Sequence, residues 1–129
     1  MPLTTLVLGA SPKPSRYSNL AVRRLRSHGH EVLAVGRHTG TIDDVPIRAA
    51  LPGSANVDTV TLYLSPQNQI AWQDAILALR PRRVIFNPGA EYARFARRLE
   101  EAGVEVVEGC TLVMLSAGPI DHAPGCRFG

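Results

Sequence analysis

The chain has 129 residues, 45% of them hydrophobic and 19% charged, and its formal net charge is +3. This length suits one domain with its own core, and this composition excludes a disordered chain. No segment approaches the roughly 20 apolar residues of a membrane helix, and the arginines form no single basic block. We therefore expect no membrane and no nucleic acid as partners. The two cysteines lack metal-binding spacing, so we expect no metal and a reduced, cytoplasmic setting.

The first part of the chain predicts a strand, a helix and a second strand. Residues 4–10 form a β-branched and leucine-rich run that is typical of a buried strand. Residues 19–30 place their apolar side chains along one stripe of a helix, with arginines on the opposite side. Ser18 or Asn19 suits the N-cap position of this helix. Residues 31–36 predict the second strand.

The middle of the chain alternates between irregular and regular patterns. Residues 37–56 contain scattered glycines and prolines and predict an irregular segment that wraps over the edge of the sheet. Residues 57–64 predict a third strand, and residues 65–81 a helix. Ser65 suits the N-cap of that helix and Pro66 its first position, where proline needs no hydrogen-bonded N–H.

The last part repeats the same alternation. Residues 82–89 predict a fourth strand, residues 91–103 an amphipathic helix, and residues 104–109 a fifth strand. Residues 110–118 predict a short helix or turn. Residues 119–129 have no periodicity and predict a loose tail.

Strands that alternate with helices and are apolar along most of their length are typical of a parallel sheet covered on both faces. We predict one Rossmann-like domain over residues 1–118, with a doubly wound, five-stranded parallel sheet and helices on both faces. Such folds bind ligands beyond the carboxyl ends of their strands, near the first strand. The loops that follow the first four strands are therefore the candidate binding segments.

The loop after the first strand has the composition of a phosphate site. It leads into a helix, whose N-terminus offers free N–H groups and a partial positive charge. Gly9 permits a tight turn and a close backbone approach. Lys13 and Arg16 add formal charge, and Ser11 and Ser18 add hydroxyl groups. The sequence thus predicts an anion at this loop. A solvated position is the alternative role of Lys13.

The glycine pattern narrows the choice of nucleotide. Ala-Ser-Pro-Lys-Pro follows Gly9, so the GxGxxG fingerprint of dinucleotide sites is absent. The second strand ends in Gly36 and Arg37, where an NAD site carries an acidic residue. A cation there favours a ribose that carries a phosphate, as in NADP and coenzyme A. A solvated loop position is the alternative role of Arg37.

Together these motifs resemble a known family. The segments VLGASPKPSRYS, GHEVLAVGR, VDTVTLYLSP, RVIFNPGAE and EGCTLVML are similar, in this order, to the small stand-alone coenzyme A-binding proteins. Their domain resembles the nucleotide-binding domain of the succinyl-CoA synthetase α subunit. The resemblance implies coenzyme A or an acyl-CoA as ligand. It implies binding without an evident reaction, because no histidine here stands in a motif like that of the synthetase's catalytic histidine.

The resemblance also implies the contacts of each loop. The first loop would lie against the pyrophosphate and the end of the second strand against the ribose phosphate. The third loop would cover the adenine, and the fourth would lie near the pantetheine arm. The residues implied are Gly9, Ala10, Ser11, Arg16 and Ser18, then Gly36 and Arg37, then Leu64, Ser65 and Pro66, and finally Asn87, Pro88 and Gly89. Relatives commonly carry Asn-Pro-Lys at the second position, so Arg37 takes the place of the lysine.

Two other functions remain open from the sequence. One is an NADP-linked reductase or a CoA-transfer enzyme subunit that needs a partner chain. The other is a protein interaction module that has lost its nucleotide. Tyr63 and Trp72 are interpreted as core or sheet-face residues, and Cys110 as a buried structural cysteine. A homodimer is also an expectation for so small a sheet.

Overall fold

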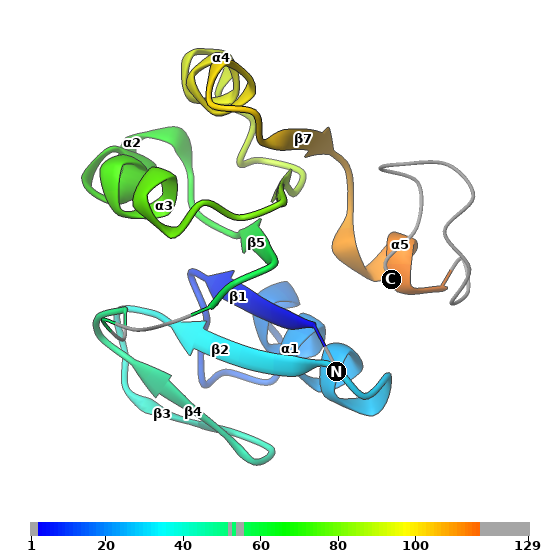
Figure 1. Ribbon diagram of the computed structural model, residues 1–129. Helices are drawn as coiled ribbons and strands as arrows, with labels where there is room; N and C mark the ends of the chain where they lie inside the picture. Colours follow the sequence, from blue (N-terminus) through cyan, green and yellow to red (C-terminus); the bar gives the residue numbers. More distant parts are fainter. Residues whose placement is uncertain (1–2, 52, 54–55, 117–129) are drawn as a thin grey trace.

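Seven strands form one mixed sheet in the computed structural model, which describes residues 3–51, 53 and 56–116 (Figure 1). The predicted tail over residues 119–129 lies outside the described residues. The strands are β1 (Thr4–Leu8), β2 (Glu31–Val35), β3 (Gly40–Ile42), β4 (Val45–Arg48), β5 (Thr59–Leu62), β6 (Arg83–Phe86) and β7 (Glu105–Glu108). Their order across the sheet is β3-β4-β2-β1-β5-β6-β7. All neighbours pair in parallel except β3 and β4, which are antiparallel.

The prediction of a five-stranded, wholly parallel sheet is wrong. Residues 37–56, expected to be irregular, contain the β3–β4 hairpin, which extends the sheet beyond β2. Ile42, Val45 and Ile47 are buried, whereas the residues beside them on these strands are exposed. This alternation is the signature of a strand with one face on the core. Asp43 adopts a left-handed φ of 51° in the turn between the strands.

Helices cover both faces of the sheet, as predicted. Ser65 is the N-cap residue of one of them and Pro66 its first residue, which confirms the predicted start. Among the described residues, no helix is long and apolar enough to cross a membrane. One face carries α1 (Tyr17–Ser27) and α5 (Thr111–Ser116), and the other carries α2 (Pro66–Gln69), α3 (Gln73–Leu79) and α4 (Ala93–Glu101), with a 3-10 turn, η1 (Ile70–Trp72), between α2 and α3.

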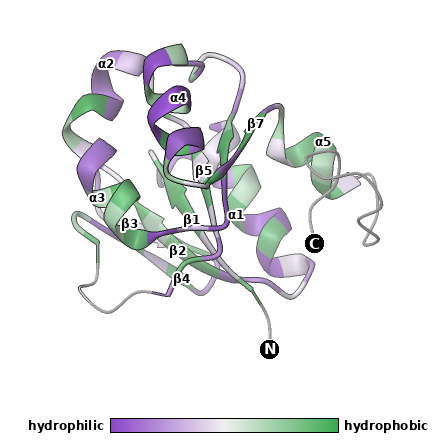
Figure 2. Ribbon diagram, turned by 45° about the horizontal axis from the view of Figure 1, so that its top comes forward, coloured by the Kyte–Doolittle hydropathy of each residue, from purple (hydrophilic) through white to green (hydrophobic). Residues whose placement is uncertain are grey.

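The core consists of two clusters on opposite faces of the sheet. Leu6 and Leu8 of β1 pack in the cluster that includes buried residues of α3 and α4. Val7, which points the other way, packs with residues of α1 and α5. Since both faces of the sheet are covered, every residue of β5 and β6 is buried, the two threonines of β5 included. Figure 2 shows hydrophobic residues along the strands and hydrophilic residues on outer helices such as α4.

The start of α1 differs from the prediction. The helix begins at Tyr17, and its N-cap residue is Arg16, which makes no side-chain cap hydrogen bond. Ser18 and Asn19 are the second and third residues of the helix, within its first turn, and are buried. Asn19 lies inside the helix, so it is not the N-cap, and its amide Nδ2 donates to the carbonyl oxygen of Ser11.

We predict that Ile47→Ala lowers the free energy of unfolding by about 2–5 kcal/mol. Ile47 is 4% exposed and packs in the cluster beneath α1, so its truncation leaves a cavity. The matched control is Arg48→Ala, at the next and exposed position of β4, which should change the free energy by less than about 0.5 kcal/mol. Urea denaturation measures both variants. Equal effects would contradict the inward packing of β4.

Candidate functional site

A cavity of about 740 Å³ opens at the carboxyl ends of β1, β2 and β5. The strand order reverses direction at β1, because β2 lies on one side of it and β5 on the other. Loops that leave such a switch point diverge and create a crevice. The cavity is lined by the β1–α1 segment, by the residues after β2 and β4, and by the segment from Tyr63 to Trp72.

Most residues predicted for the site line this one cavity. They come from three loops that lie far apart in the sequence and meet at one edge of the sheet. The first loop contributes its glycine, its polar residues and both cations, and the second contributes the glycine-arginine pair. The predicted residues that line the cavity are Gly9, Ala10, Ser11, Lys13, Arg16, Ser18, Gly36, Arg37 and Leu64.

The predicted loop after β6 does not line the cavity. Asn87, Pro88 and Gly89, together with Ser65 and Pro66, do not line the cavity. Asn87 is 2% exposed, and its amide group is fully engaged within the protein.

The Asn87 amide joins two strands to α5. Its Nδ2 donates to Oγ1 of Thr61 at 2.6 Å and to the carbonyl oxygen of Leu62 at 2.9 Å. Its Oδ1 accepts the backbone N–H of Thr111 at 2.9 Å. The hydroxyl groups of Thr61 and Thr111 lie 2.7 Å apart and complete the network. Buried polar groups satisfied in this way hold the carboxyl ends of β5 and β6 together.

The ends of β1 and β2 touch through their backbones. The N–H groups of Gly9 and Ala10 both donate to the carbonyl oxygen of Val35, at 2.8 and 3.0 Å. A Cβ atom added at Gly36 would overlap the carbonyl oxygen of Ala10, and one added at Gly9 would lie 2.7 Å from that of Tyr63. Gly9 also has a φ of 96°, which favours glycine. These glycines therefore bring three strand ends together to form the floor of the cavity.

The entrance to α1 has the electrostatic character of an anion site. The first-turn N–H groups of a helix have no acceptor within it, and in the described part of the chain the N-cap residue, Arg16, makes no side-chain cap hydrogen bond to them. The first turn contains no acidic residue. Arg16, Lys13 and Arg37 line the cavity beside it, and none of the described lining residues is acidic. This end of the cavity thus combines free backbone donors with three cations.

Aromatic residues form another part of the wall, and the sequence interpretation missed them. Tyr63 and Trp72 are half-buried and line the cavity in addition to packing against the core. Tyr17 is 73% exposed and lines it from the first turn of α1. Burial raises the pKa of Tyr63 to about 12, so its hydroxyl stays protonated at neutral pH. In the sequence, only the position of Tyr17 directly after Arg16, a predicted site residue, could have indicated an aromatic residue in the cavity wall.

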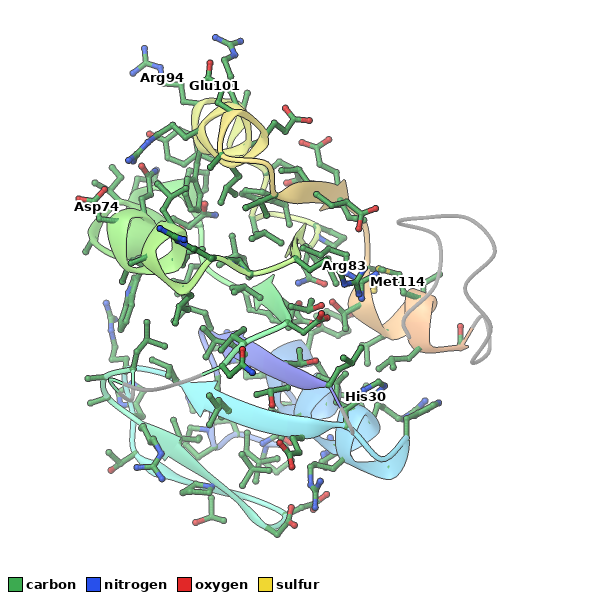
Figure 3. The ribbon with its side chains drawn as sticks, in the orientation of Figure 1. His30, Asp74, Arg83, Arg94, Glu101 and Met114 are labelled. Atoms are coloured by element: carbon green, nitrogen blue, oxygen red, sulfur yellow. The ribbon has the colours of Figure 1, made fainter. Side chains whose placement is uncertain are left out.

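Other polar groups lie away from the cavity. Arg83, fully buried, begins β6, and His30 precedes β2, so both are at the amino-terminal edge of the sheet (Figure 3). Burial lowers the pKa of His30, and the charge of Arg83 acts in the same direction. Cys110 is half-buried and does not line the cavity. The described residues contain no group of three or more histidine, cysteine or acidic side chains that could hold a metal ion.

A protein-family model matches nearly the whole of the described chain. Residues 3–116 match the model of the CoA binding domain. The chain belongs to the CoA binding domain family. The match includes all strands and helices of the described structure, so the cavity at the end of β1 belongs to the CoA binding domain itself. No curated protein matches the chain.

Several solved structures share the fold. A crystal structure of an uncharacterized protein is 51% identical, with a TM-score of 0.87, and the match covers 91% of this chain and 97% of that one. The cell-free ID.343 protein from Thermus thermophilus is 30% identical, with a TM-score of 0.75 and coverage of 81% of each chain. A dinucleotide forming acetyl-coenzyme A synthetase from Ca. Korarchaeum cryptofilum is 16% identical, with a TM-score of 0.70, over 84% of this chain and 26% of that one. It shares the fold.

We predict that Gly36→Ala lowers the free energy of unfolding by about 1–3 kcal/mol in the absence of ligand. The added methyl group would overlap the Ala10 carbonyl oxygen and force the ends of β1 and β2 apart. Gly53→Ala is the control, because a Cβ there meets no atom within 4 Å. Thermal and urea denaturation measure both. A Gly36→Ala protein as stable as the Gly53→Ala protein would contradict the close contact of the two loops.

Proposed function

We propose that the protein binds coenzyme A or an acyl-CoA in the cytoplasm, as a binding or regulatory module. The adenosine diphosphate would lie across the loops that follow β1 and β2. The observation that carries this proposal is the N-terminus of α1. Its first-turn N–H groups are uncapped, and Lys13, Arg16 and Arg37 line the cavity beside it. Membership of the CoA binding domain family supports a ligand of this class.

A diphosphate matches the charge of this entrance. A helix N-terminus carries about half a positive charge, and a cation beside it is unfavourable unless an anion lies between them. Arg16 occupies the N-cap position and Lys13 lies in the loop before it. An anion here would accept hydrogen bonds from the first-turn N–H groups and interact with both cations. The N–H groups of Gly9 and Ala10 are used by Val35, so the donors for the ligand lie further along the loop.

The rest of the cavity suits the remaining parts of such a ligand. Arg37 is exposed at the end of β2, where its guanidinium can form two hydrogen bonds to the phosphate on the ribose. Trp72 and Tyr17 offer aromatic surface for the adenine or the pantetheine arm. A volume of about 740 Å³ lies within the range of small-molecule sites, roughly 300–1,000 Å³. Leu64 and Ala49 add apolar surface.

The direct test is thermal unfolding with coenzyme A, acetyl-CoA, dephospho-CoA, NADP, NAD and ATP. A ligand that binds only the folded protein raises the melting temperature by mass action. We predict that coenzyme A raises it more than dephospho-CoA, NADP, NAD or ATP does. A larger shift with NADP would replace the proposal by an NADP-dependent activity. No shift with any compound at about 1 mM would contradict coenzyme A binding and favour an interaction module.

The role of Arg37 has its own prediction. Arg37→Ala should weaken coenzyme A binding by roughly tenfold and leave the affinity for dephospho-CoA nearly unchanged, because that ligand lacks the ribose phosphate. Arg48→Ala removes the same charge from a nearby exposed position that does not line the cavity, and serves as control. Calorimetric titration measures the affinities. Equal losses for both ligands would show that Arg37 does not contact the ribose phosphate.

A further inference from the structure

The loop between β1 and α1 has few hydrogen bonds of its own. Pro12 and Pro14 have no N–H group to donate. Within the loop, the N–H of Lys13 donates to Oγ of Ser11 at 3.2 Å, and the N–H of Arg16 donates to the carbonyl oxygen of Lys13 at 3.1 Å. Neither bond ties the loop to the rest of the protein. The loop nevertheless carries two of the cations that line the cavity.

Two side chains of α1 donate hydrogen bonds to backbone carbonyl oxygens of the loop. Nδ2 of Asn19 donates to the carbonyl oxygen of Ser11 at 3.0 Å. Nη2 of Arg23 donates to the carbonyl oxygen of Pro14 at 3.1 Å. Past Ala10, these are the hydrogen bonds that tie residues 11–15 to another element of the described chain. The two bonds hold the loop at Ser11 and at Pro14, on either side of Lys13.

Arg23 also sets the orientation of Asn19. Its Nε donates to Oδ1 of Asn19 at 2.8 Å, across one turn of the helix. A guanidinium can only donate hydrogen bonds, so it holds the oxygen side of the amide toward itself. The NH2 side of the amide then faces Ser11. Asn19 is 3% exposed, so its hydrogen bonds to Ser11 and Arg23 are partly shielded from water, whereas the bond from Arg23 to Pro14 lies at the surface.

Neither Asn19 nor Arg23 lines the cavity. We propose that Arg23, acting with Asn19, is a positioning residue that holds the β1–α1 loop in its ligand-binding shape before the ligand arrives. Arg23 does so by hydrogen bonding to Pro14 and Asn19, without touching the ligand's phosphates. This inference rests on the proposed function. A loop ordered in advance loses less conformational freedom on binding, so the pair raises affinity through preorganisation.

The test compares Arg23→Ala with Arg24→Ala. Arg24 is the next residue of the same helix and is exposed, so its substitution removes the same charge without touching the loop. Hydrogen exchange of the Lys13 and Arg16 amides is measured in the unliganded proteins. Calorimetry then gives the coenzyme A affinity at several salt concentrations. Arg16→Ala is included as a variant that removes a cation lining the cavity.

We expect Arg23→Ala to speed exchange of both loop amides roughly fivefold or more, because local opening of the loop becomes easier. We expect its coenzyme A affinity to fall about tenfold, which corresponds to about 1.4 kcal/mol. The salt dependence of that affinity should stay as in the wild type, whereas Arg16→Ala should flatten it by removing a direct charge interaction. Arg24→Ala should match the wild type in loop exchange.

Three results would overturn the proposal. The first is loop exchange in Arg23→Ala equal to that in Arg24→Ala. The second is faster exchange with unchanged affinity. The third is a salt dependence flattened as in Arg16→Ala, which would make Arg23 a direct phosphate contact. If the wild type binds no coenzyme A, the proposed function fails, and the exchange measurement still decides whether Arg23 holds the loop.

Discussion

The contact between the ends of β1 and β2 is the constraint on which the site depends. The carbonyl oxygen of Val35 accepts two N–H groups, from Gly9 and Ala10, at the point where β1 ends. This arrangement needs Gly36, because any side chain there would overlap Ala10. The contact turns the chain sharply away from the sheet. It thereby places the following loop and the start of α1 over the cavity.

The electrostatics of the site follow from this geometry. The start of a helix ordinarily receives a capping side chain or an acidic residue. Here Arg16 occupies that position instead, and Asn19, a residue type that caps well, supports the loop. The unliganded protein therefore keeps an unfavourable charge arrangement of about 0.3–1 kcal/mol at this helix end. Under the proposed function, an anionic ligand would relieve this repulsion on binding.

The prediction from sequence succeeded where side-chain pattern alone decides the structure. The five predicted strands, β1, β2, β5, β6 and β7, are rich in aliphatic residues, and the helices between them carry apolar stripes. The β3–β4 hairpin was missed because it is short and contains Pro46, and because its alternation extends over only Ile42, Val45 and Ile47. A turn made by Asp43 in a left-handed conformation has a weak sequence signal.

The candidate site could be predicted as a set of loops, because topology alone brings the carboxyl ends of parallel strands together. Which side chains face the cavity depends on packing that no local pattern records. Asn87 looked like a binding residue, yet its amide completes a buried network with Thr61 and Thr111. Trp72 looked like a core residue, yet it packs against the core and lines the cavity as well.

The central claim is that the diphosphate of coenzyme A binds at the uncapped start of α1. A crystal structure of the protein with coenzyme A tests it most directly. The account predicts phosphate oxygens within hydrogen-bonding distance of first-turn N–H groups of α1, with Arg16 beside them. A diphosphate bound elsewhere, or oriented away from α1 and toward solvent, would contradict it.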